Sequence, residues 1–169
     1  FTSLAPGTTA TVIYWITLGA NSVRLRAAED PEFKVLIRQT VAPVGGTVDY
    51  YVGLRLDTST GLTDGIYIRS TNVGNWFLVC RNGGVETTVD LGSAPGSTLV
   101  LLEARVSGAG TSVQAYVNGV ATGAAIATNI PTAILARCGV FVDNRAATIT
   151  TGATVQVYEG LGFKVDLVA

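Results

Sequence analysis

The feature that most constrains this chain is a series of short runs in which apolar residues occupy every second position. In the run around Tyr50, Val52 and Leu54, polar or small residues separate the apolar ones. Tight-turn signals close such runs at Asn82-Gly83-Gly84 and Asn118-Gly119. Period-two runs separated by Gly, Asn, Asp and Pro are typical of antiparallel sandwiches and barrels.

The same pattern extends to both ends of the chain and predicts about eleven to thirteen strands. Residues 11–18, 22–28 and 32–40 read as strands, and residues 122–131 as a long surface loop or a poorly paired edge. A helix over residues 26–38 is the competing interpretation, but Pro31 lies in its middle and would interrupt it. We therefore predict an all-β fold, an antiparallel two-sheet β-sandwich.

The length of 169 residues suits one core. No linker or internal repeat divides the sequence, so residues 1–169 are expected to form a single jelly-roll domain. No apolar run reaches the roughly 18 residues that a membrane span requires, so membrane insertion is not expected.

The composition is poor in charge. Charged residues make up 14% of the chain, against about 25% in an average soluble domain, and the mean hydropathy is +0.43. Either the chain has a large core and a Thr- and Ser-rich exterior, or neighbouring subunits cover part of its surface. The net charge is −1 and the basic residues are scattered, so nucleic-acid binding is not expected.

The residue types also limit the chemistry. Histidine is absent, which excludes histidine bases, Ser-His-Asp triads and histidine metal ligands. Cys80 and Cys138 lack metal-site spacing, and they are interpreted as core thiols, with a single disulfide as the alternative. Asp57 and Asp64 could ligate Ca²⁺ in a loop, but turn capping is the preferred interpretation. No catalytic residue, metal or cofactor is predicted.

A sugar-binding site requires an exposed aromatic platform with polar neighbours. The best such group in the sequence is Asn75 and Trp76 after a turn, with Tyr67 and Arg69 on the adjoining strand. The alternative, which the alternation favours, is that Trp76 is a core residue.

Several stretches resemble the concanavalin A-like lectin/glucanase superfamily, also described as laminin-G-like jelly rolls. They are residues 51–57 (YVGLRLD), 64–68 (DGIYI), 76–79 (WFLV), 113–119 (VQAYVNG), 138–143 and 163–167. The resemblance implies two stacked antiparallel sheets, one of them curved and concave. The Thr-, Gly- and Ala-rich composition is similar to the forms found in bacteriophage virion proteins.

The superfamily contains glucanases, and glycoside hydrolysis requires two converging carboxylates. The Glu-x-Asp-x-x-Glu strand of the glucanase branch is missing here. Glu86 and Asp90 share a strand face, but they are interpreted as a solvated strand edge. The expectation is therefore that the chain is not an enzyme.

These observations favour a structural or attachment module of an extracellular assembly, a bacteriophage capsid-surface or tail-fibre protein being the leading hypothesis. Its expected location is the virion or the extracellular space. Its expected partners are copies of itself, other virion or assembly proteins and host-surface glycans. The alternative is a carbohydrate-binding, lectin-like domain that uses the concave face, and a glycoside hydrolase ranks last.

Overall fold

A computed structural model of the chain describes residues 2–4, 13–17, 25–41, 48–58, 61–71, 74–93, 98–133, 135, 137–144 and 154–164. Within these residues there are twelve strands and one short 3₁₀ turn. The strands are β1 (Thr2–Leu4), β2 (Ile13–Thr17), β3 (Glu32–Val41), β4 (Val48–Thr58), β5 (Gly61–Thr71), β6 (Asn75–Asn82), β7 (Val85–Ser93), β8 (Val100–Ser107), β9 (Ser112–Val117), β10 (Val120–Ile126), β11 (Arg137–Asn144) and β12 (Thr154–Lys164). The 3₁₀ turn is η1 (Ala27–Glu29).

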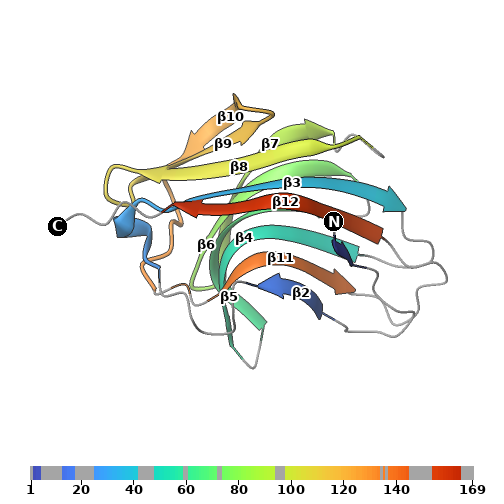
Figure 1. Cartoon of the computed structure of the whole chain (residues 1–169). Helices are drawn as coiled ribbons and strands as arrows, with labels where there is room; N and C mark the ends of the chain where they lie inside the picture. The colour runs from blue at the N-terminus through green and yellow to red at the C-terminus, as the bar shows by residue number, and fades with distance from the viewer. Residues whose placement is uncertain are drawn as a thin grey trace.

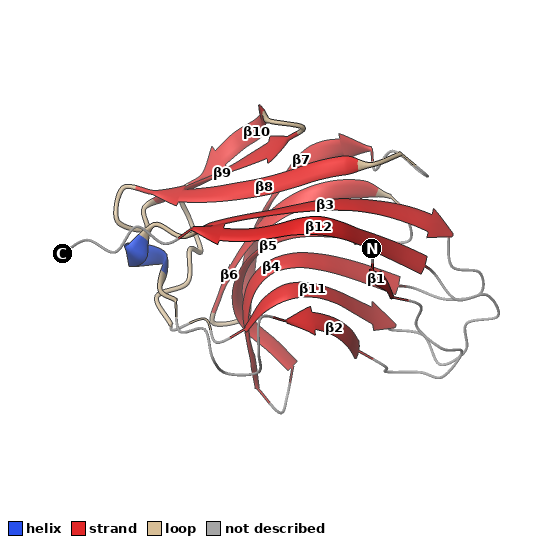
Figure 2. Cartoon of the chain, viewed as in Figure 1, coloured by secondary structure: helices blue, strands red, loops and turns tan. Residues whose placement is uncertain are grey.

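The strands form two antiparallel sheets that pack face to face (Figures 1 and 2). The first sheet has the order β1-β12-β3-β8-β9-β10 and the second the order β2-β11-β4-β5-β6-β7. Figure 1 shows the strands of the second sheet as bent arcs. The predicted two-sheet β-sandwich of the jelly-roll type is confirmed.

The alternation in the sequence decides which side chains fill the space between the sheets. In β4, Tyr50, Val52 and Leu54 are fully buried, and Ile66 and Ile68 lie beside them on β5. The first sheet contributes its own buried side chains: Phe33, Val35, Ile37, Leu102, Ala104, Val113 and Ala115. Each large apolar side chain removed from water in this way stabilises the fold by about 1.5–3 kcal/mol.

The two predicted tight turns are present. Gly83 and Gly84 both have positive φ between β6 and β7, as do Asn118 and Gly119 between β9 and β10. The carboxylate of Asp64 accepts a hydrogen bond from the Gly83 backbone N–H at 2.9 Å, so this aspartate caps the neighbouring turn between β6 and β7.

One segment differs from the sequence prediction, and a second matches one of the two alternatives given for it. The strand expected over residues 22–28 is wrong in its described part, where Leu25 makes only an isolated bridge to Leu135 and η1 follows. Asp30 ends η1 in the left-handed conformation, and the Glu29 side chain caps the Arg26 backbone N–H at 2.8 Å, so the local hydrogen bonds favour a turn. The other segment, 122–131, begins as part of β10, an edge strand with a register shift, which is the second of the two expectations for it.

Cys80 is a free thiol in the core, and burial raises its pKa to about 12. Among the described residues, no three Cys, Asp or Glu side chains are grouped so that they could hold a metal ion. In the same part of the chain, no helix has the length and apolar character needed to cross a bilayer.

Candidate functional site

The outer face of the second sheet, which points away from the first sheet, carries a second group of buried side chains. Tyr51, Tyr67 and Val79 are 3%, 0% and 0% exposed, and Leu62 and Phe77 pack against them while remaining partly exposed. We call these five residues the outer cluster. They alternate along β4, β5 and β6 with residues of the main core. An outer sheet face usually meets solvent, so this one is unusually well filled.

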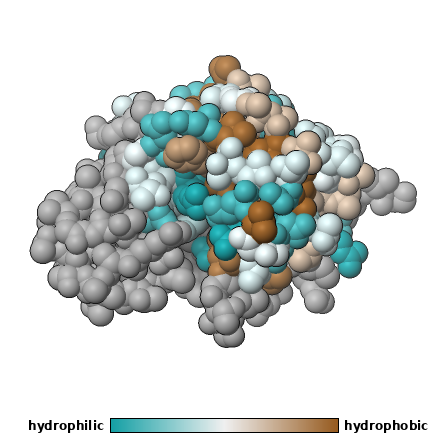
Figure 3. All heavy atoms as spheres, turned by 180° about the vertical axis from the view of Figure 1, so that it is seen from behind, coloured by the Kyte–Doolittle hydropathy of each residue, from teal (hydrophilic) through white to brown (hydrophobic). Residues whose placement is uncertain are grey.

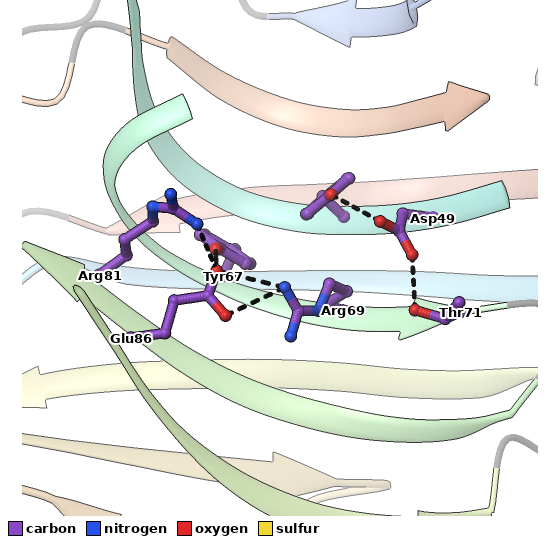
Figure 4. Close-up of polar contacts among 7 residues, drawn as sticks. Asp49, Tyr67, Arg69, Thr71, Arg81 and Glu86 are labelled. Atoms are coloured by element: carbon purple, nitrogen blue, oxygen red, sulfur yellow. Dashed lines mark hydrogen bonds and ion pairs between the residues drawn. The ribbon is translucent and has the colours of Figure 1, made fainter. Parts of the chain in front are cut away.

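Polar contacts order one side of the outer cluster (Figure 4). The rings of Tyr51 and Tyr67 meet edge to face with centroids 5.4 Å apart, and the Arg55 guanidinium lies 5.3 Å from the Tyr51 ring centroid. The Tyr51 hydroxyl donates to Asp49 Oδ2 at 2.9 Å, and the Thr71 hydroxyl donates to Asp49 Oδ1 at 2.5 Å. Asp49 is therefore a buried carboxylate, and each of its two oxygens accepts a hydrogen bond from a hydroxyl group.

On the other side of the cluster, Glu86 of β7 accepts hydrogen bonds from three side chains (Figure 4). Tyr67 Oη donates to Glu86 Oε1 at 2.8 Å, and Arg81 Nη1 donates to the same oxygen at 2.7 Å. Arg69 Nη1 reaches both carboxylate oxygens at 3.2 Å. We call these four residues the Glu86 network. The antiparallel register, with Arg81 opposite Glu86, brings them together from β5, β6 and β7.

The network shifts the pKa of Glu86 and of Tyr67. Burial raises the pKa of Glu86, but the hydrogen bonds from Tyr67 and Arg81 and the charges of Arg69 and Arg81 outweigh it. The net effect lowers the pKa below its ordinary value of 4.5. Burial, and then the neighbouring Glu86 charge, raise the pKa of Tyr67. At neutral pH the network therefore holds one carboxylate, two guanidiniums and a neutral phenol.

The lowered pKa of Glu86 predicts that acid weakens the fold. A carboxyl group whose pKa is lower in the folded state stabilises that state above its unfolded pKa, and the contribution disappears as the pH falls through the folded-state pKa. We expect the urea midpoint to fall less for Glu86→Gln than for the unsubstituted protein between about pH 7 and about pH 3. Equal declines in the two proteins would contradict this assignment.

The structure separates the four site residues that the sequence suggested. Tyr67 and Arg69 lie on the outer face and join the Glu86 network. Asn75, at the start of β6, donates through Nδ2 to Asp90 Oδ2 at 2.8 Å. Trp76 is 2% exposed and belongs to the main core, in agreement with the preferred core interpretation, so its ring offers no exposed platform.

The aromatic residue that the sequence interpretation missed is Phe77. It is partly exposed, lies opposite Arg69 in the register and packs against the outer cluster. Its signal was present in the alternation, because a residue next to an inward-facing Trp76 must point outward in a strand. The space-filling view from behind (Figure 3) shows hydrophilic residues across the described surface with smaller hydrophobic patches between them.

No family profile matches the sequence, and no curated protein is significantly similar to it. Solved structures share the fold. A family 7 alginate lyase, A1-II′, in complex with substrate aligns with a TM-score of 0.60 and 12% identity over 94% of this chain and 79% of the lyase. A β-glucanase of Bacillus licheniformis aligns with a TM-score of 0.57 and 15% identity over 84% of this chain and 65% of the glucanase. The carbohydrate-binding module CBM66 of Bacillus subtilis aligns with a TM-score of 0.51 and 9% identity over 89% of this chain and 92% of the module.

These similarities support the concanavalin A-like resemblance at the level of the fold. They contradict the leading functional expectation of a bacteriophage structural module, because the similar structures are polysaccharide lyases, a glucanase and a carbohydrate-binding module. The expectation that the chain is not an enzyme is overturned by the same finding. The carbohydrate-binding alternative fits the comparisons better than the main hypothesis did.

Proposed function

We propose that this chain binds a polysaccharide through the outer face of its second sheet, at the edge of the outer cluster where β5, β6 and β7 run side by side. The observation that supports the proposal most directly is the pairing of a partly exposed aromatic ring, Phe77, with the ordered polar groups of the Glu86 network.

The chemistry of this surface suits a sugar. A pyranose ring presents apolar C–H groups on its faces and hydroxyls around its rim, so it requires both an aromatic surface and fixed hydrogen-bonding groups. Phe77 offers the first, and Arg69, which lies opposite it on β5, offers the second. Arg81 and Glu86 lie about 13 Å further along β6 and β7, where they would meet a neighbouring unit of the polysaccharide. The side chains of Arg69, Arg81 and Glu86 are 20%, 27% and 21% exposed, so each is held in place yet still reachable.

Rigidity adds to the suitability of the site. Tyr67 and Val79 form a fully buried layer beneath the exposed groups, and the side chains stand on paired strands. Groups that are already fixed lose little conformational freedom when a ligand binds, which favours affinity. The proteins of similar fold include a carbohydrate-binding module and polysaccharide-degrading enzymes, which is consistent with the proposal.

Phe77→Ala tests the proposal. Removing the ring should weaken oligosaccharide binding at least about tenfold, because a buried Phe side chain contributes roughly 1.5–3 kcal/mol. The matched control is Tyr116→Ala on β9, a partly buried aromatic residue on the outer face of the other sheet. Binding should be measured by calorimetry against a panel of neutral and acidic oligosaccharides, with circular dichroism to verify the fold.

Two outcomes would count against the proposal: no binding to any oligosaccharide of the panel, or equal losses for the Phe77 and Tyr116 variants. Mass spectrometry of the same mixtures after long incubation would detect shortened chains. Cleavage that depends on Phe77 would place a catalytic reaction at this face.

A further inference from the structure

We infer that the saccharide recognised at this face carries negatively charged groups, either the carboxylate of a uronic acid or a sulfate ester, and that one of them lies against Arg81. The inference rests on the proposed function and adds the chemical class of the ligand. It follows from the excess of guanidinium donors over acceptors in the Glu86 network.

The first step is the donor count. A guanidinium has five N–H donors, and among the described residues Arg81 directs one hydrogen bond, from Nη1, to Glu86. Its Nε is buried and meets no acceptor in the part of the chain that the structure describes. Glu86 does not serve it: its Oε1 accepts from Tyr67, Arg69 and Arg81, and its Oε2 accepts from Arg69.

The second step is the charge balance. Arg69 and Arg81 contribute two positive charges and Glu86 one negative charge, so the network carries an excess of +1. An unbalanced charge that is partly withdrawn from water is unfavourable unless an opposite charge approaches it. A sugar hydroxyl could accept a hydrogen bond but would leave the excess charge in place.

Two other described carboxylates of this face lie away from Arg81. Asp49 of β4 accepts from the Tyr51 and Thr71 hydroxyls, and the Arg55 guanidinium lies over the Tyr51 ring beside it. Asp90 lies opposite Phe77, whereas Glu86 lies opposite Arg81. Those two positions of β6 are four residues apart, about 13 Å along an extended strand, so the charges of Asp90 and Arg81 are largely screened from each other at physiological salt. Arg69, opposite Phe77 in the register, is the guanidinium nearer to Asp90. Asp90 also accepts from Asn75 and from the Gly92 backbone N–H.

An oxyanion at the exposed part of Arg81 would balance the excess charge and accept hydrogen bonds from guanidinium N–H groups other than the buried Nε. Carboxylate and sulfate oxygens match the planar fork of a guanidinium and form short, charge-assisted hydrogen bonds that a neutral hydroxyl cannot equal. The exposed 27% of the Arg81 side chain leaves room for such a group to approach.

The test compares three probes of equal chain length: an oligogalacturonate, a sulfated galactan oligosaccharide and a neutral β-glucan oligosaccharide. Calorimetry at low salt should show that at least one anionic probe binds more tightly than the neutral one and that its affinity falls as salt is added. Arg81→Gln should weaken this binding about tenfold and weaken binding of the neutral probe by a smaller factor, so that the anionic preference falls. The anionic probe that binds more tightly identifies the group as uronate or sulfate.

The matched control is Arg105→Gln on the outer face of the first sheet, where a guanidinium is also paired with glutamates, Glu32 and Glu103. It should leave all affinities unchanged. Arg81→Lys keeps the charge without the planar fork and should lose part of the anionic preference, and circular dichroism would verify that each variant is folded.

Equal affinity for neutral and anionic probes, or an Arg81→Gln variant that keeps the full anionic preference, would overturn the inference. If a neutral probe still bound in a way that depended on Phe77, the proposed polysaccharide binding would stand without the inferred anionic group. Absence of binding to all three probes would overturn both the proposed function and the inference.

Discussion

Gly53→Ala should lower the free energy of unfolding by about 3 kcal/mol or more, a large part of the stability of a chain of this size. Gly53 lies inside β4, between β5 and β11, with φ of +145°, a conformation that L side chains rarely adopt. A Cβ at this position would lie 2.7 Å from Tyr67 Cα and 2.8 Å from Phe33 Cζ, and closer still to the Ile66 carbonyl oxygen. Two of these three neighbours are backbone atoms of β5, so the clash can be relieved only by separating the strands.

Gly83→Ala is the matched control. Gly83 also has positive φ, at +56°, but nothing lies within 4 Å of the position that a Cβ would take. Its substitution should cost only about 1 kcal/mol, the conformational penalty alone. Urea unfolding monitored by tryptophan fluorescence would measure both variants, and the difference between them isolates the steric contribution at Gly53. Similar losses for the two variants would contradict the explanation.

The different roles of these glycines show how far the sequence could predict the fold. The Asn-Gly-Gly turn at residues 82–84 is a local signal, and it was predicted because positive φ in a two-residue hairpin loop depends on adjacent residues alone. Gly53 looked like any outward position of an alternating strand. Its requirement for glycine comes from strand β5 and from Phe33 on the opposite sheet, which the alternation cannot place.

The candidate site shows the same limit. The alternation placed Tyr67 and Arg69 on an outward face, and the structure confirms that they lie there. Glu86 was interpreted as a solvated strand edge, yet it joins Tyr67 and Arg81 in one network. A period of two assigns faces but not the register between strands, and a shift of one residue would have moved Glu86 to the other face of the sheet.

Trp76→Ala is expected to destabilise the fold by about 3–5 kcal/mol, the usual cost of replacing a buried Trp or Phe by Ala. Trp76 is 2% exposed and packs in the main core, opposite Ser70 in the register. A loss of sugar binding in this variant would therefore reflect unfolding and not a missing contact.

Trp76→Phe separates the two explanations. The indole Nε1 is buried and has no hydrogen-bond partner among the described residues, so replacing it removes an unsatisfied donor while most of the apolar volume remains. The cost should be well below that of Trp76→Ala, because the phenyl ring keeps most of the side-chain atoms in the core. Sugar affinity per folded molecule should be unchanged by Trp76→Phe and strongly reduced by Phe77→Ala. The opposite pattern would mean that the two neighbouring rings had exchanged faces, and the site proposed on the outer face of the second sheet would have to be abandoned.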